Sequence, residues 1–157
     1  MSAEETMRVQ KISDGTVIDH IAAGKSLSVL RLLGNPQNRG VTVALVMNVS
    51  SSKMGRKDIV KVEGVELTDE QVQRLALIAP RASVVIIRSY RVAEKKKAVP
   101  PEVVTGILSC TNTTCISVKE KDSVQSIFSL ASPSPVSYRC RFCGRVLSEQ
   151  EISAQLG

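Results

Sequence analysis

The segments Cys110-Thr-Asn-Thr-Thr-Cys115 and Cys140-Arg-Phe-Cys143-Gly144 decide how the second half of this 157-residue chain folds. The four cysteines are the only ones in the sequence, and 24 residues separate the two pairs. Two closely spaced pairs of thiolates supply the four ligands that a tetrahedral structural Zn²⁺ takes. Gly144 is placed to adopt the positive φ that turns backbone N–H groups toward the sulfurs. No histidine or carboxylate interrupts the set, so we expect one closed structural zinc ion per chain and no hydrolytic centre.

Disulfides are the competing interpretation of the four cysteines. The opening Met1-Ser-Ala-Glu4 does not resemble a signal peptide, and no apolar run is long enough to span a membrane. We therefore expect a cytoplasmic protein without a membrane partner, in which thiols stay reduced and paired cysteines indicate a metal. Iron is the alternative metal, because four thiolates also bind iron. A colourless purified protein would exclude it.

The net charge of +6 is unevenly distributed. Residues 1–100 contain 16 lysines and arginines against 10 aspartates and glutamates, whereas residues 101–157 contain five of each class. A zinc ribbon that binds nucleic acid needs a basic face. The chain also has no Trp and only two Phe and two Tyr, so few rings are available to stack on bases. These observations disfavour the alternative function, a zinc-ribbon nucleic-acid-binding protein, and we expect no nucleic-acid partner.

A charged stretch with two prolines, Lys95-Lys-Lys-Ala-Val-Pro-Pro101, separates two segments of different composition. Such a stretch is typical of an interdomain connection. We expect domains at residues 1–98 and 105–157, joined by a linker at 99–104. The second segment has few apolar residues, so we expect a small antiparallel β domain whose stability depends on the metal.

The first segment alternates between strand and helix patterns. β-rich runs predict strands at 16–21, 41–49, 57–63 and 83–92, and 41–49 is apolar enough to be a buried central strand. With helices at 25–33 and after residue 68, the order is βαββαβ, the ferredoxin-like arrangement of an α+β domain. Residues 8–12 are expected to add an extra strand at the N-terminus. Such a sheet carries two helices on one face and leaves the other face free for a ligand or partner.

Local signals mark the two helices. In 25–33, Val29, Leu30 and Leu33 share one helical face, and Gly34 follows at the position that ends helices. The stretch Thr68-Asp-Glu-Gln71 is a capping box, in which the Thr side chain and the Gln side chain satisfy each other's backbone N–H groups.

The sequence offers no catalytic constellation, but several polar residues have two interpretations. Asp19 and His20 either end a strand in solvent or form a corner that binds a small molecule, with the imidazole near an anion. Lys61, in an otherwise apolar strand, is either solvated or offers a point charge to phosphate. Lys95 to Lys97 either keep a linker soluble or join Lys57 and His20 in a triphosphate pocket. Spacing alone leaves these alternatives open.

Three motifs, in this order along the chain, resemble the regulatory chain of aspartate carbamoyltransferase: Gly15-Thr-Val-Ile-Asp-His-Ile21, Met54-Gly-Arg-Lys-Asp58 and the two cysteine pairs. The resemblance extends from about residue 9 to about residue 147. It implies a non-catalytic allosteric subunit in pyrimidine biosynthesis, with an N-terminal domain that binds ATP, CTP and UTP and a C-terminal zinc domain that docks on the catalytic chain. It also implies pairing with a second regulatory chain, in a dodecamer of two catalytic trimers and three regulatory dimers.

Carried over by motif, the resemblance assigns residues to the effector nucleotide site. Asp19 suits the ribose hydroxyls, whereas His20, Lys61 and Lys95 suit the phosphates. The base and ribose would be lined by Val9, Ile12, Val17, Ile87, Tyr90 and Val92. Two departures stand out. Val85 lies where family members often carry an asparagine that affects base discrimination, and Thr114 lies where a second asparagine often follows Asn112.

Overall fold

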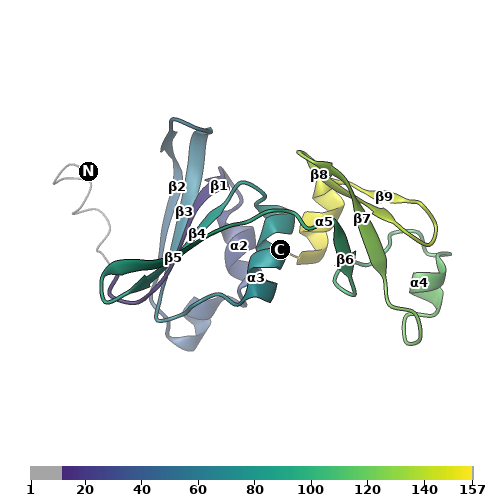
Figure 1. The fold of residues 1–157 in the computed structure, drawn as a ribbon, viewed down its shortest axis with the longest axis horizontal. Coiled ribbons are helices and arrows are strands. Elements are labelled where there is room, and N and C mark those ends of the chain that lie inside the picture. The colour runs from purple at the N-terminus through teal and green to yellow at the C-terminus, as the bar shows by residue number, and fades with distance from the viewer. Residues whose placement is uncertain (1–11, 157) are drawn as a thin grey trace.

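The computed structural model describes residues 12–156 and contains two antiparallel sheets with three helices between them (Figure 1). The first sheet has the strand order β2-β3-β1-β4-β5. Its strands are β1 Gly15–Ala22, β2 Val43–Ser51, β3 Gly55–Glu63, β4 Ser83–Arg88 and β5 Arg91–Lys97. Helices α2 Ser26–Leu32 and α3 Asp69–Ile78 cover one face of this sheet, and the short 3-10 helix η1 Pro36–Arg39 follows α2.

The predicted α+β fold with a βαββαβ order is confirmed, but the extra strand has a different origin. The strand predicted at 83–92 ends at Arg88, because Ser89 and Tyr90 adopt positive φ angles and turn the chain into a hairpin. The return strand, β5, contains the lysines that the sequence suggested belonged to a linker. β5 is an edge strand, where charged side chains are common. Of the strand expected at 8–12, only Ile12 lies within the described residues, and it is not in a strand.

The segment expected to form a buried central strand is the opposite edge of the sheet. In the described part of the chain β2 pairs only with β3, and Met47 on it is 45% exposed. Apolar composition indicates contact on both faces of a strand, but it does not reveal whether that contact lies within the same chain. The prediction of a central position for 41–49 was therefore wrong.

Both predicted helix signals are confirmed. The Thr68 hydroxyl accepts a bond from the N–H of Gln71, and the Gln71 side chain accepts one from the N–H of Thr68. Val29, Leu30 and Leu33 are buried in the core between sheet and helices, together with apolar residues of β1, β3 and β4.

A bulge in β1 creates the polar corner predicted around Asp19 and His20. Ile18 and Ile21 are both fully buried although only two residues lie between them, which strict alternation in a strand does not allow. The pairing of β1 with β3 shifts register between these two residues, and His20 takes a φ of 58°. The bulge therefore leaves Asp19 and His20 outside the core.

Asp58, which follows Lys57 on β3, fixes the backbone around this corner. Its fully buried carboxylate accepts N–H bonds from Gly24 at 3.0 Å, Ser26 at 3.1 Å and Asn48 at 2.8 Å. Burial by itself raises the pKa of Asp58, but these hydrogen bonds outweigh it and hold the pKa below its usual value. The carboxylate thus ties the start of α2 and a second bulge, in β2, to β3.

The second sheet has the order β6-β7-β8-β9, as the expected small antiparallel domain requires. Its elements are β6 Val103–Thr105, α4 Ile116–Lys119, β7 Ile127–Pro133, β8 Val136–Cys140, β9 Val146–Leu147 and α5 Glu149–Leu156. The expected linker at 99–104 overlaps β6 at its last two residues. Helix α5 is a difference from the elements predicted above, although Ser148 and Glu151 form a capping box that signals its start.

Helix α5 joins the two domains. It packs against α2 and α3, and Ile152 of α5 is buried with Leu77 of α3 in the core of the second domain. The connecting segment is held at both ends, because the N–H of Ala98 donates to Ala82 and the Tyr138 hydroxyl donates to the carbonyl of Pro101 at 2.6 Å. The second domain therefore shares part of its core with the first.

Candidate functional site

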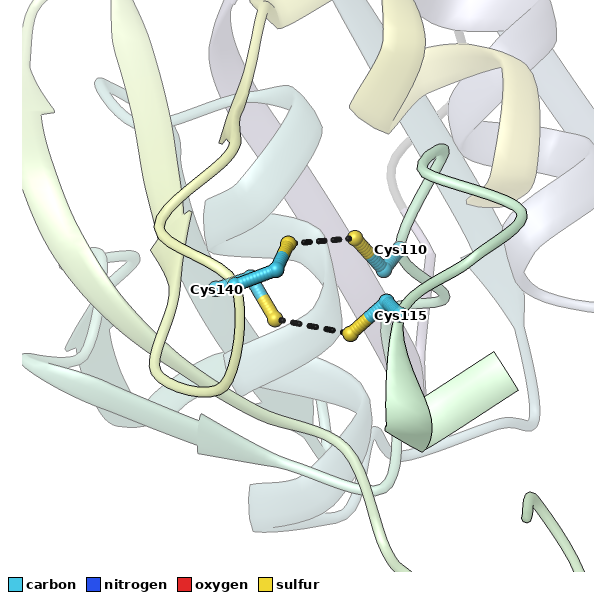
Figure 2. A group of neighbouring side chains, drawn as sticks. Cys110, Cys115 and Cys140 are labelled. Atoms are coloured by element: carbon cyan, nitrogen blue, oxygen red, sulfur yellow. Dashed lines mark hydrogen bonds between the residues drawn. The ribbon is translucent and has the colours of Figure 1, made fainter. Parts of the chain in front are cut away.

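The four cysteines predicted to bind a metal come together at the end of the second sheet. Their sulfur atoms all lie within 4.8 Å of one another, with Sγ–Sγ distances of 3.5 Å for Cys110 and Cys143 and 3.7 Å for Cys115 and Cys140. Figure 2 shows the sulfurs of Cys110, Cys115 and Cys140 pointing toward one another. Four thiolates around one zinc stand about 3.8 Å apart, whereas a disulfide needs about 2.05 Å. The geometry therefore fits a metal site and not disulfides.

Local structure brings the thiols to this point. Cys115 is the residue before α4, and Cys140 ends β8. Gly144 has the predicted positive φ, 80°, and its N–H closes the turn on the carbonyl of Cys140 at 2.9 Å. The buried hydroxyl of Ser117 lies 3.1 Å from the sulfur of Cys115.

Burial and hydrogen bonding set the protonation of the thiols. Burial raises the pKa of Cys110 to about 12, whereas the N–H of Arg145 lowers the pKa of the exposed Cys143 to about 6. A metal that binds here must displace protons from the buried thiols, because thiolates are the ligating form.

The open face of the first sheet collects most of the predicted nucleotide-binding residues. Cross-strand pairing places five residues in one row over the whole width of the sheet: Ala44, Lys61, Val17, Val85 and Lys95. The two lysines stand on either side of the two valines, about 14 Å apart across three strand spacings. Ile87 pairs with Val92 one row away on the same face.

Asp19 and His20 lie at the end of this face, beside a hollow of about 380 Å³. Lys57 forms an ion pair with Asp19 at 2.9 Å, and Nδ1 of His20 lies 3.3 Å from the Ser83 hydroxyl. The hollow is lined by Asp19, His20, Lys53, Ser83, Val85, Lys95, Lys96 and Lys97. Burial lowers the pKa of His20 below its usual value; Asp19 opposes this shift, and the charges of Lys57, Lys53 and Lys97 add to it.

The remaining predicted residues differ in their placement. Ile12 is buried, Tyr90 is 69% exposed at the β4–β5 turn, and Val9 lies outside the described residues. Lys61 shares the row but does not line the hollow. Lys53 and Ser83 also line the hollow but were not predicted from the sequence. No local motif marks them, and Lys53, which lies in a turn, comes close to His20 only because the chain folds back.

Comparison with known proteins gives the family. Residues 7–99 match the aspartate carbamoyltransferase regulatory chain, allosteric domain, and residues 102–153 match its metal binding domain. The aspartate carbamoyltransferase regulatory chain of Korarchaeum cryptofilum is 49% identical over 153 residues, which cover 98% of each chain. That of Pyrococcus horikoshii is 50% identical over 96% of this chain and 98% of the relative. The chain belongs to the aspartate carbamoyltransferase regulatory chains.

Membership in the regulatory chains has direct consequences. The chain is a non-catalytic regulatory chain with an allosteric domain and a metal-binding domain. The nucleic-acid-binding alternative is therefore set aside. Within residues 12–156, no helix is long and apolar enough to cross a membrane.

Proposed function

We propose that this regulatory chain binds a nucleoside triphosphate (ATP, CTP or UTP) on the open face of its first sheet and transmits the binding to the catalytic chain through its second domain. The observation that carries the proposal is the row in which Lys61 and Lys95 flank Val17 and Val85, with Asp19 and His20 at the end of the same face. An apolar strip bounded by cations fits an aromatic base and ribose with attached phosphates.

Each residue has a role that follows from its chemistry. The phosphates accept charge-assisted hydrogen bonds from Lys95, Lys61 and the imidazole of His20. Asp19 is held by Lys57 and still has lone pairs for a ribose hydroxyl. Ile87 and Val92 extend the apolar strip beyond the valines. Val85 offers no amide to the base, so discrimination between bases rests on other groups of the site.

We assign zinc as the metal and give it a structural role. An all-cysteine donor set with sulfurs about one tetrahedral edge apart is typical of structural zinc, one ion per chain. Zinc supplies no chemistry to a reaction here, since four protein ligands complete its coordination. Reduced, metal-binding thiols also fit a cytoplasmic protein.

The surface around the cysteines suits docking on the catalytic chain. Ile116 is 51% exposed beside Cys115, and Phe142 is 42% exposed between Cys140 and Cys143. In the loop before Cys115, the side-chain oxygen of Asn112 accepts bonds from the N–H and the hydroxyl of Thr114. A metal-pinned loop loses little entropy when it docks.

The exposed edge strand β2 suits pairing with a second regulatory chain. Within residues 12–156 no strand lies along its outer side, and its apolar side chains are half-buried or, at Met47, exposed. An unpaired apolar edge is a template for the strand of another chain. Such pairing gives the regulatory dimers of the dodecamer, which comprises two catalytic trimers and three regulatory dimers.

A continuous route leads from the nucleotide face to the metal domain. Lys95 and Lys97 belong to β5, which runs directly into the segment anchored at Ala98 and Pro101. Leu77 adds a second connection, since α3 lies in the core of the metal domain at that residue. A nucleotide that shifts β5 therefore changes how the metal domain presents its docking surface.

The decisive experiment is aspartate saturation of the assembly formed from this chain and catalytic trimers. We expect the curve to shift when ATP or CTP is saturating, with a coupling of about 1–3 kcal/mol. Asp19→Ala is expected to blunt the shift while the assembly still forms. Superimposable curves, with nucleotide shown to be bound, would mean that the chain has a structural role in the assembly and does not regulate it.

His20 gives a second test, because it is the only histidine in the chain. Its pKa is lowered in the free protein, and bound phosphate favours the imidazolium, so nucleotide is expected to raise the pKa. Binding should therefore strengthen as the pH falls from above the pKa of the complex to below that of the free protein. An NMR titration of His20 with and without ATP measures both values. A pKa that ATP leaves unchanged or lowers contradicts phosphate contact at His20.

A further inference from the structure

A second hollow, of about 200 Å³, shares His20, Lys53 and Lys97 with the first. It is lined by His20, Lys53, Met54, Pro80, Arg81 and Lys97. These residues come from the β1 bulge, the β2–β3 turn, the loop between α3 and β4, and the end of β5. The guanidinium of Arg81 donates to the carbonyl of Lys53 at 3.4 Å, which holds the turn and the loop together. The volume of the hollow is enough for several water molecules of about 30 Å³ each, and therefore for a tetrahedral oxyanion.

The charges of this hollow are unbalanced. No carboxylate lines it, and within residues 12–156 Lys53, Arg81 and Lys97 form no ion pair. By contrast, Lys57 is paired with Asp19, and Lys96 with Asp69. The fields of Lys53 and Lys97 also contribute to the lowered pKa of His20, so these cations act on one small volume. Concentrated positive charge in a concave site attracts anions.

We infer that the hollow between Lys53, Arg81 and Lys97 is a second phosphate subsite that continues the nucleotide pocket past His20. The inference rests on the proposed effector function for the neighbouring pocket, with which it shares His20, Lys53 and Lys97. The ligand class is a linear oligophosphate. It is either the end of a nucleotide phosphate chain longer than three groups or an inorganic oligophosphate bound by itself.

Arg81 allows the subsite to be tested separately, because it lines the second hollow and not the first. Calorimetry with inorganic tripolyphosphate on the zinc-loaded full chain is expected to show binding that Arg81→Gln weakens about tenfold or more. Affinity for ATP should change little in the same variant. The matched control is Arg56→Gln, which removes the same charge from an exposed arginine of β3 that lines neither hollow. Its affinity for tripolyphosphate should equal that of the parent.

Two further arms distinguish the sources of the phosphate. If the subsite takes the end of a nucleotide, adenosine tetraphosphate binds more tightly than ATP, and Arg81→Gln removes the difference. If it takes a separate anion, tripolyphosphate still binds when ATP is saturating. Either result supports the subsite. Absence of tripolyphosphate binding, or equal losses in Arg81→Gln and Arg56→Gln, overturns it. Arg81-dependent tripolyphosphate binding without any ATP binding would instead overturn the proposed nucleotide function alone.

Discussion

Removal of the metal is expected to unfold the second domain and to release the catalytic chain. Three of the four cysteines are buried in the core of that domain, whose sheet has only four short strands. Structural zinc sites of small domains contribute about 10–16 kcal/mol of apparent binding free energy, which is lost with the metal. Treatment with a thiol reagent, or the Cys115→Ser substitution, should therefore abolish the ordered signals of the second sheet in NMR spectra.

The first sheet provides the internal control for this experiment. None of the four cysteines belongs to its hydrophobic core. The NMR signal of His20 and the binding of nucleotide should therefore persist after the metal is removed. Thr113→Ser, at an exposed position of the same loop, should retain metal and partner. Co-sedimentation with catalytic trimers measures the association. Metal-free protein that binds the trimers as tightly as the parent would show that the metal does not maintain the docking surface.

Replacement of Lys95 or Lys61 by alanine is expected to weaken ATP and CTP binding by about tenfold or more. A charge-assisted hydrogen bond to phosphate contributes about 1.5–3 kcal/mol, and about 1.4 kcal/mol corresponds to a factor of ten. Calorimetric titration of each variant with both nucleotides measures the loss. Zinc content should remain unchanged, because both lysines lie on the first sheet.

Lys119 supplies a control of the same charge. It is the exposed last residue of α4 in the second domain, and it lines neither hollow. Lys119→Ala should therefore leave nucleotide affinity close to that of the parent. Equal losses in Lys95→Ala and Lys119→Ala would indicate a general effect of net charge and not a phosphate contact.

Features determined by neighbouring residues could be predicted from the sequence. The capping box at Thr68 and the positive φ of Gly144 are properties of a few consecutive residues, and both were confirmed. Helix α5 shows that one such signal was overlooked, since Ser148 and Glu151 carry the same kind of box. The nucleotide-site residues as a set, and the domain boundaries, stay predictions.

Features that depend on a neighbouring element could not be predicted in the same way. The apolar composition of β2 predicts a central strand, yet among the described residues no strand pairs with its outer edge. β5 reads as a linker because it is charged, yet alternation along the strand directs Lys95 and Lys97 to the open face and Lys96 to the helices. The amino-acid composition of a strand therefore does not reveal which element it pairs with or which face of the sheet each side chain occupies.

The sequence alone predicted the four-cysteine cluster, because cysteines in two short-spaced pairs can converge with only two turns of local structure. The open-face row is a different case. Val17, Lys61, Val85 and Lys95 are far apart in sequence, and the strand order β3-β1-β4-β5 and its register decide that they form one row. A shift of one residue in any pairing would turn that strand's residue to the helix side. Tertiary structure alone therefore decided which cations share a surface, because register is fixed by the burial of the opposite face.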